Sequence, residues 1–162
     1  MLWGEFMEIK VRQAKNADVD NAIALAEEVF DIFEAPVFTE EGVQSFKDFL
    51  YGANMRKMRE KGDIIFWNAY CGEILAGTCA LRDGRHISLL FVHSDFHRQG
   101  IGRMLMDTAC RHALKMHKQR RITVNSSPYG VPFYASYGFT PTDMERITDG
   151  IRYTPMIYFS KE

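Results

Sequence analysis

The sequence has little net charge, few cysteines and no long apolar run, and each shortage excludes a class of protein. Lysine and arginine number 20 against 21 aspartates and glutamates, so the formal net charge is only -1. No overall electrostatic field therefore favours a nucleic acid or an anionic membrane as partner. No segment approaches the roughly 20 apolar residues that a membrane-spanning helix needs. We expect a protein that binds neither nucleic acid nor membrane.

Cysteine and the N-terminus supply two further absences. Cys71, Cys79 and Cys110 form an odd set without C-x-x-C spacing, so no metal site is predicted. Cys71 and Cys79 could face each other across a hairpin, but a reduced cytosolic interior explains them more simply. Residues 1–6 have neither the basic start nor the apolar run of a signal peptide. We therefore expect a cytoplasmic protein, a loosely ordered extension over residues 1–6, and Met7 as an alternative start.

The remaining sequence is typical of one globular domain. Hydrophobic residues make up 46% of the 162 positions, and no repeat or linker interrupts them, so a single domain over residues 1–162 is predicted. Period-two and helical patterns predict, in order, a strand near residues 9–11, helices after Asn16 and from about Thr39, three strands over residues 64–92, a helix over 100–116, a strand at 122–124, a short helix over 129–137 and two closing strands. Asn16 is expected to cap its helix. The order β-α-α-β-β-β-α-β-α-β-β indicates a mixed α/β fold.

The most informative segment is the connection between the strand ending at Val92 and the helix after Gly100. It reads His97-Arg98-Gln99-Gly100-Ile101-Gly102. The first turn of a helix carries unpaired N–H groups and partial positive charge, and glycine lets an anion approach the backbone. The turn is therefore expected to bind a phosphate group. Taken alone, it could equally be a tight strand-to-helix connection.

Two common phosphate-binding patterns do not fit this turn. Gly102 is followed by Arg103 rather than by the lysine of a P-loop, and Leu105 stands where a dinucleotide fingerprint needs glycine or alanine. A nucleotide-binding enzyme is therefore the weaker interpretation. Residues 92–105 instead resemble motif A of the GNAT superfamily of acetyl-CoA-dependent N-acetyltransferases, which has the pattern Q/R-x-x-G-x-G/A. The departure is His97, which occupies the Gln/Arg position.

Residues 124–139 resemble motif B of the same superfamily. Tyr134 and Gly138-Phe139 match that motif, and Ser127 stands where an asparagine is usual. The resemblance covers nearly the whole chain. It implies the GNAT-like acyl-CoA N-acyltransferase fold, a mixed and largely antiparallel central sheet with helices on both faces. It also implies an acyltransferase that moves acetyl from acetyl-CoA to a primary amine by direct attack in a ternary complex, without a metal.

The resemblance assigns roles to particular residues. The pantetheine arm would lie between two splayed strands and pair with main-chain groups of Phe91 and Val92, and the Val92 N–H would polarise the thioester carbonyl. Tyr134 would protonate the leaving thiolate, although it could merely fill space between helix and sheet. Residues implied to contact the cofactor are Phe91, Val92, His97, Arg98, Gln99, Gly100, Ile101, Gly102, Arg103, Ser127 and Tyr134.

The general base is the least defined part of this prediction. His86 falls where some amine acetyltransferases of the family have a histidine, and alternation would place His86 and Ser88 on one face of their strand. A histidine at a solvated strand start is an equal alternative, and many relatives use water. Cys110 is expected to pack in the core.

The sequence leaves the acceptor open. Phe30, Phe33, Phe46 and Phe49 are mainly core residues that could also line an acceptor pocket, and Asp31, Glu34, Glu40 and Glu41 could attract a cationic amine or form a solvated loop. Residues 153–156 could border the acceptor or a homodimer interface. The rival from another class is a non-catalytic acyl-CoA-binding or regulatory module, which would need no acid at Tyr134.

Overall fold

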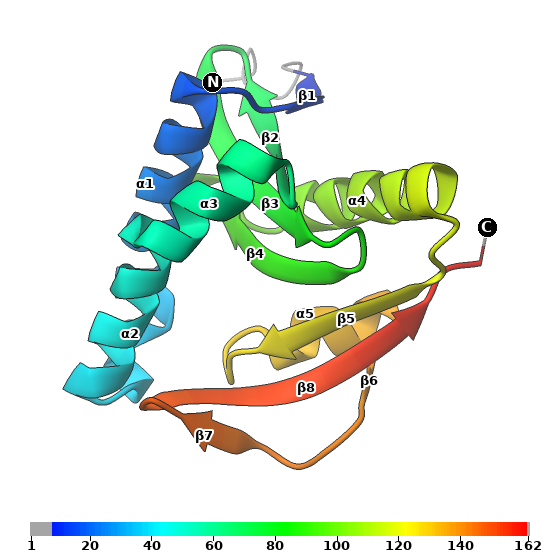
Figure 1. The fold of residues 1–162 in the computed structure, drawn as a ribbon. Helices are drawn as coiled ribbons and strands as arrows, with labels where there is room; N and C mark the ends of the chain where they lie inside the picture. The colour runs from blue at the N-terminus through cyan, green and yellow to red at the C-terminus, as the bar shows by residue number, and fades with distance from the viewer. Residues whose placement is uncertain (1–7, 162) are drawn as a thin grey trace.

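The central feature of the computed structural model, which describes residues 8–161, is one sheet of eight strands (Figure 1). The strands are β1 (Ile9–Gln13), β2 (Ile64–Cys71), β3 (Ile74–Arg82), β4 (His86–Val92), β5 (Arg121–Ser126), β6 (Thr140–Pro141), β7 (Arg146–Thr148) and β8 (Ile151–Phe159). Their order is β1-β2-β3-β4-β5-β8-β6, with β7 paired to β8. All pairs are antiparallel except β4 with β5. The expected loose extension and the choice of start lie outside the described residues.

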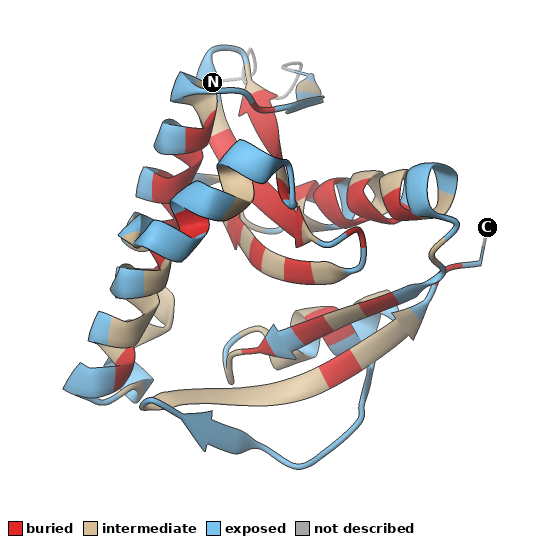
Figure 2. Ribbon diagram, viewed as in Figure 1, coloured by how far each residue is buried: buried red, intermediate tan, exposed pale blue. Residues whose placement is uncertain are grey.

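Helices cover both faces of the sheet (Figure 1). On one face lie α1 (Ala17–Phe33), α2 (Glu40–Tyr51) and α3 (Ala53–Lys61), and on the other α4 (Ile101–His117) and α5 (Val131–Tyr137). Short 3-10 turns span Ala35–Val37 and Ser94–Phe96. Each face buries its own apolar cluster, and the red stripes of Figure 2 follow the sheet and the inner sides of α1 and α4. None of the helices within residues 8–161 combines the length and the apolar character needed to span a membrane.

The predicted fold class is confirmed, and two local predictions are wrong. The single helix expected from Thr39 is two helices, because Gly52 adopts an extended conformation between α2 and α3. Asn16 stands at the N-cap of α1 but its side chain makes no capping hydrogen bond, since its backbone has φ 49° rather than the β-region value of an ordinary cap.

A bulge in β4 changes which core each of its residues enters. Ile87 pairs with Leu81, whereas Leu89 pairs with the next residue, Ala80, so Ser88 is an extra residue in the ladder. Ile87 accordingly packs in the α4 cluster while Leu89 packs in the α1 cluster. Simple alternation along β4 therefore does not extend past Ser88, although it was the basis for expecting His86 and Ser88 on one face.

The two halves of the sheet separate beyond the start of β4. Only His86 and Ile87 pair with β5, opposite Thr123 and Val124. After these two positions the strands diverge, and Figure 1 shows β5 and β8 leaving β4 at an angle. Among the described residues no other strand fills the space, so one edge of β4 has no strand partner there along most of its length.

The far end of this opening is bridged by two glycines. A Cβ on Gly42, at the start of α2, would lie 2.2 Å from the Gly150 carbonyl oxygen in the β7–β8 turn. Asp149 and Gly150 both have positive φ, 53° and 79°, as a two-residue type I′ hairpin requires. The Ser45 hydroxyl donates to the Asp149 carbonyl oxygen at 2.8 Å. The Asp-Gly pair is a hairpin signal that the sequence interpretation overlooked.

We predict that Gly42→Ala destabilises the protein although alanine is the better helix former. The new methyl group must displace the backbone of the β7–β8 turn, which we expect to lower the free energy of unfolding by about 1–3 kcal/mol. Urea unfolding measures the change. Gln44→Ala, an exposed position on the same helix, serves as control and should stay within about 0.5 kcal/mol of the parent. Equal or greater stability of Gly42→Ala would contradict the close contact.

Candidate active site

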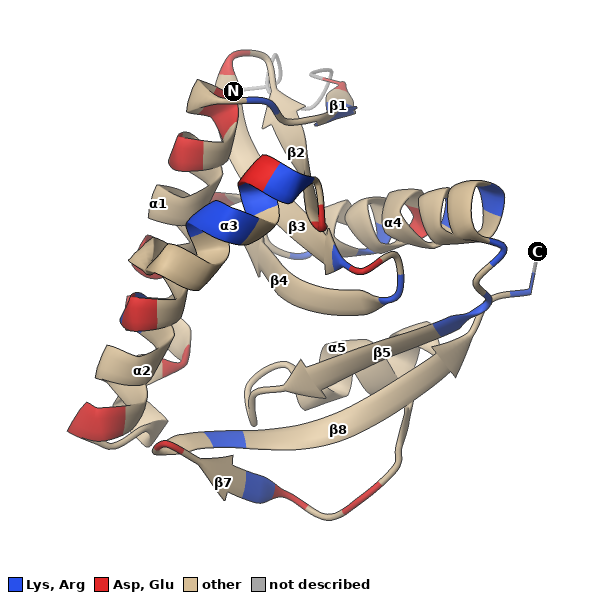
Figure 3. Ribbon diagram, viewed as in Figure 1, with Lys and Arg blue, Asp and Glu red and all other residues tan. Residues whose placement is uncertain are grey.

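A cavity of about 1080 Å³ occupies the region where β4 and β5 separate. Its walls come from both halves of the sheet, with Ile87–Val92 on one side and Val124–Ser126 on the other. The loop after Val92 and the start of α4 form one end, and α1, α2 and β8 form the other. β4 carries no Lys, Arg, Asp or Glu (Figure 3), so charge inside the cavity comes from a few side chains on the surrounding elements.

The α4 end of the cavity is built to receive an anion. Gly100 is the N-cap of α4 with φ 79°, and Arg98 before it has φ 63°. No side chain caps the helix and its first turn holds no acidic residue, so among the described residues no side chain occupies the N–H groups there. A Cβ on Gly100 would meet nothing within 4 Å. At Gly102, in contrast, it would come within 3.0 Å of the Phe133 ring.

His97 ties this turn to the end of β4. Its Nε2 lies 2.8 Å from the Val92 carbonyl oxygen. Since a carbonyl oxygen only accepts, Nε2 carries the hydrogen and donates it. The His97 ring also lies 5.0 Å from that of Phe33, which stacks on Tyr129 at 5.0 Å. The departure from the motif A pattern therefore retains a polar side chain that fixes the loop against the strand.

The main chain of Val92 faces the opening. The next residue, His93, donates its N–H to Ala76 of the β3 side at 2.8 Å. Hydrogen-bonded and non-bonded pairs alternate in an antiparallel ladder, so Val92, opposite Gly77, directs its N–H away from β3. By the same alternation Phe91, opposite Thr78, turns its backbone to β3. This register favours Val92 over Phe91 for the expected main-chain contacts, while the Phe91 side chain still lines the cavity.

Tyr134 lies in the cavity wall from α5. The side chain is 7% exposed, and its ring packs against Phe133 and Phe139 with centroids 5.3 Å away in each case. Burial, with smaller contributions from Cys79 and Glu34, holds the pKa of its hydroxyl well above the usual value. Tyr134 therefore stays protonated at neutral pH, and it fills space as well as presenting a phenol to the cavity.

Glu34 is the one carboxylate among the described residues that line the cavity. It follows α1 directly, where Ala35-Pro36 ends the helix, and its backbone N–H donates to the Phe30 carbonyl oxygen at 2.9 Å. Burial raises the pKa of Glu34 to about 7, and a hydrogen bond from Ser127 opposes part of that rise. The other three acids expected near this connection lie elsewhere: Asp31 pairs with Lys47 at 3.2 Å, and Glu40 and Glu41 are exposed at the start of α2.

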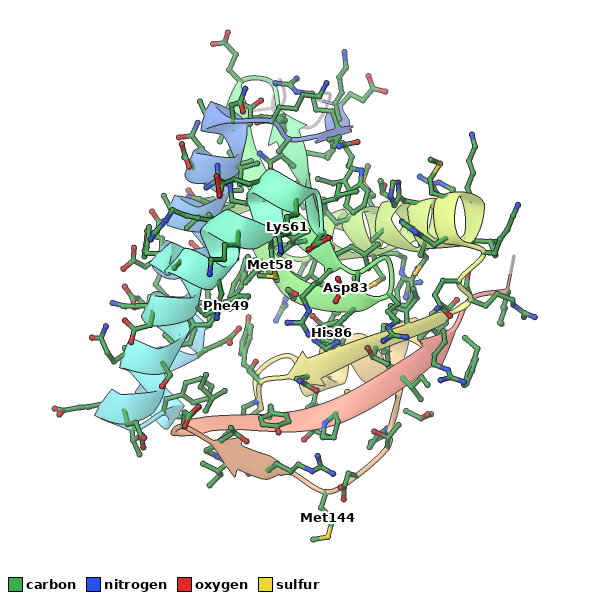
Figure 4. All side chains as sticks on the ribbon, viewed as in Figure 1. Phe49, Met58, Lys61, Asp83, His86 and Met144 are labelled. Carbon is green, nitrogen blue, oxygen red and sulfur yellow. The ribbon has the colours of Figure 1, made fainter. Side chains whose placement is uncertain are left out.

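His86, the predicted base, does not line the cavity. Figure 4 shows it at the β3–β4 turn, beside Asp83. Its Nδ1 lies 2.8 Å from the Thr123 hydroxyl, and burial lowers the pKa of the ring to about 4. Arg82 lowers it further. An imidazole with so low a pKa takes up a proton poorly at neutral pH, so the structure gives the base role no support.

The structure thus brings most of the predicted residues together and adds others. All eleven residues of the expected cofactor set line the cavity except Gln99, and Phe30, Phe33, Phe46 and Phe49 line it too. The sequence interpretation gave no role to Arg152 and named Ser88 only as a neighbour of His86; both line the cavity, and the buried Ser88 hydroxyl has no hydrogen-bond partner among residues 8–161. It could not single out Glu34 from three neighbouring acids, because nothing local distinguishes a carboxylate that faces a cavity from one that faces water.

Known proteins place this architecture in a family. The family model of the acetyltransferase (GNAT) domain matches residues 34–159, and the chain belongs to this family of acetyltransferases. No curated protein sequence matches it. Similar solved structures include a GCN5-related N-acetyltransferase from Rhodopseudomonas palustris (20% identity, TM-score 0.78, covering 93% of this chain and 94% of that one) and the PaiA N-acetyltransferase from Thermoplasma acidophilum in complex with coenzyme A (21%, 0.74, 94% and 99%). YjaB from Escherichia coli is also similar (22%, 0.67, 95% and 99%).

The three cysteines are free thiols that lie outside the cavity lining. The hairpin register pairs Cys71 with Ile74 and Cys79 with Trp67, so the first two do not face each other. Cys79 and Cys110 are buried, and burial raises the pKa of Cys79 strongly and that of Cys110 to about 11. Both therefore remain thiols at neutral pH, which is unfavourable for a nucleophile.

We predict that iodoacetamide labels only Cys71 in the folded protein at pH 8. The other two thiols are buried and protonated, so they should react only after unfolding. Mass spectrometry of the intact protein counts the labels, with the urea-unfolded protein as the three-label reference. In Cys71→Ser, labelling should vanish in the folded state. Rapid labelling of Cys110 there would contradict its assignment as a packing residue.

Proposed function

We propose that this protein transfers the acetyl group of acetyl-CoA to a primary amine by direct attack within a ternary complex. The observation that carries the proposal is the continuity of one cavity, which joins the α4 N-terminus to the free edge of β4 and to Tyr134. Acyl transfer from coenzyme A uses an anion site for the pyrophosphate, a donor that polarises the carbonyl and an acid, and the α4 N-terminus, the Val92 N–H and Tyr134 would fill these roles. The cytoplasmic location and the homodimer stay predictions from the sequence.

The donor end of the cavity fits coenzyme A on two grounds. Within residues 8–161 no side chain caps the first turn of α4, and Arg98 and Arg103 also line this part of the cavity and add positive charge, which suits a pyrophosphate. The free edge of β4 matches an extended arm that carries amide groups, because such an arm can pair as an added strand. Ser127, also expected to touch the cofactor, lines the same cavity and lowers the pKa of the nearby Glu34.

Each protein group then has a defined chemical task. The Val92 N–H donates to the thioester carbonyl and stabilises negative charge on its oxygen during attack. Tyr134 donates its proton to the departing sulfur, a role that its high pKa permits because the phenol is always protonated beforehand. Holding donor and acceptor in one cavity supplies most of the rate by removing the entropy of encounter.

The alternative function is a non-catalytic acyl-CoA-binding or regulatory module. Such a module would use the α4 end of the cavity and leave Tyr134 without a task. The lack of any hydrogen bond from the Tyr134 hydroxyl to the described residues favours the enzyme, because a purely structural buried phenol usually has a partner.

We predict that Gly100→Ala weakens acetyl-CoA binding at least tenfold. The left-handed conformation at Gly100 penalises any side chain by about 1–2 kcal/mol, and the new methyl group occupies the approach to the helix N-terminus. Isothermal titration with acetyl-CoA measures the affinity, with ATP and NAD as comparison ligands.

Gly62→Ala is the matched control for this change. Gly62 has φ 74°, close to the 79° of Gly100, and a Cβ there also meets nothing within 4 Å. Both variants should lose similar stability, and only Gly100→Ala should lose affinity. If the parent protein binds no acetyl-CoA, or binds ATP in preference, the proposed function fails.

We predict that Tyr134→Phe lowers kcat about 100-fold while the dissociation constant of acetyl-CoA stays within a factor of two. The change removes the proton donor to sulfur but keeps the ring that packs on Phe133 and Phe139. Thiol release measures turnover. Tyr137→Phe removes a phenol from the same helix, one that donates to Asp107 at 2.6 Å outside the cavity, and should keep kcat. Unchanged turnover in Tyr134→Phe would contradict the acid role of Tyr134, whereas a parent protein that binds acetyl-CoA but shows no turnover would favour the regulatory module.

A further inference from the structure

We infer that Glu34 binds the ammonium group of the acceptor and removes its proton, and that the acceptor is a monoamine with a hydrophobic body. The inference rests on the proposed function, because it names the acceptor half of the same cavity. It replaces His86 as the base and chooses among the amines that the sequence leaves open.

The position of Glu34 supports this role. It enters the cavity from the end of α1, opposite the loop that holds Ser127 and close to Tyr134 of α5, whose pKa it influences. The Ser127 oxygen accepts the Gly130 N–H at 3.1 Å, so the Ser127 hydroxyl hydrogen is free to point at the carboxylate. The Ser127 hydroxyl can therefore donate to one carboxylate oxygen of Glu34, which leaves the other lone pairs of the carboxylate available to an acceptor amine.

The protonation state of Glu34 suits a base that works near neutral pH. Burial raises its pKa to about 7, so a large fraction is ionised at pH 7 and can still accept a proton from an adjacent ammonium. The titratable groups on the elements around it are His97 before α4, Tyr129 and Tyr134 on the α5 side, and Arg152 and Tyr153 on β8. Of these groups none contributes to the shift, which comes from burial and from Ser127.

The wall around Glu34 is aromatic. Phe30 stacks on Phe46 with centroids 4.1 Å apart, Phe33 stacks on Tyr129, and Phe46 lies 5.9 Å from Phe91. Phe38 and Phe49 complete this wall from either side, and Phe49 projects from α2 toward the sheet (Figure 4). Aromatic faces accommodate both an ammonium group and an apolar body, so the cavity fits an amine that carries a hydrophobic group.

The few charged side chains that line the cavity argue against polyamines and amino acids as acceptors. A polyamine needs several carboxylates, whereas Glu34 is the single one among the described lining residues. An amino acid needs a cation for its carboxylate, and the nearest cation on β8, Arg152, already pairs with Glu145 at 3.3 Å and donates to the Val37 carbonyl oxygen. A monoamine places its one charge on Glu34 and leaves no group unpaired.

The protons balance in this scheme. The ammonium gives one proton to Glu34, which later releases it to solvent, and the neutral amine attacks the thioester carbon. A C–N bond forms and the C–S bond breaks. The sulfur receives the Tyr134 proton, and the second proton lost by nitrogen as the amide forms replaces it.

The test measures kcat/KM for phenethylamine by thiol release between pH 6 and 9, in the parent protein, Glu34→Gln and the control Glu40→Gln. In the parent, log kcat/KM should rise with unit slope and level off near pH 7, because deprotonated Glu34 then serves an ammonium substrate. Glu34→Gln should be about 100-fold slower at pH 7. Its log kcat/KM should keep rising up to pH 9 without levelling off near pH 7, because only the free amine, whose pKa is near that of lysine, can react. Glu40→Gln should match the parent, and acetyl-CoA affinity should match in all three.

The substrate arm compares phenethylamine with phenylalanine and spermidine in the parent protein. Phenylalanine keeps the aromatic body and adds a carboxylate, and spermidine replaces the body with further amines. We expect kcat/KM for phenethylamine to exceed both at least tenfold. A preference for either rival overturns the monoamine assignment, and a Glu34→Gln profile like that of the parent overturns the base. If the parent binds acetyl-CoA yet acetylates none of the three, the monoamine assignment is overturned, whereas a parent that does not bind acetyl-CoA overturns the proposed function itself.

Discussion

The separation of β4 from β5 is the constraint on which the rest of this structure depends. A parallel pair that continued along both strands would bury the edge of β4 and close the sheet, but pairing ends after His86 and Ile87. The main-chain groups beyond that point then need partners from outside the sheet, because a buried N–H without an acceptor is costly. His97 supplies one, at the Val92 carbonyl oxygen. The Val92 N–H has no partner on β3 by the register, so the opening creates both the cavity and the polar group that we propose for the thioester carbonyl.

The bulge at Ser88 lets one short strand serve this opening and two cores at once. It sends Ile87 to the α4 side and Leu89 to the α1 side, which anchors both helical layers to β4. The hairpin turn at Asp149-Gly150 closes the other end, where it meets Gly42 of α2. Packing contacts therefore close the cavity at its ends, and no hydrogen-bonded pairing of β4 with β5 crosses its middle.

The parts of this site that could be predicted from the sequence are the local ones. The turn from His97 to Gly102 and the helix that carries Tyr134 each lie within a few consecutive residues, so spacing and residue type were informative. The bulge at Ser88 and the cavity position of Glu34 depend on contacts between segments far apart in the chain. Glu34 differs from Asp31, Glu40 and Glu41 only because the loop at Ser127 lies against it, and no pattern within the first two helices records that contact.

Burial raises the pKa of both Tyr134 and Glu34. The two groups act differently because a phenol and a carboxyl start from very different pKa values. The pKa of Tyr134, already high for a phenol, is raised well above its usual value, so the hydroxyl stays protonated at physiological pH. Glu34 is raised only to about 7, where it exchanges a proton with an amine at physiological pH. An ammonium in contact with Glu34 would lower that pKa again, since opposite charges stabilise each other. Binding of the cation and ionisation of Glu34 therefore favour each other, and the pKa of Glu34 returns toward about 7 once the ammonium has given up its proton and its charge. A cavity with a second carboxylate would lose this property, because like charges would hold one acid neutral at all times.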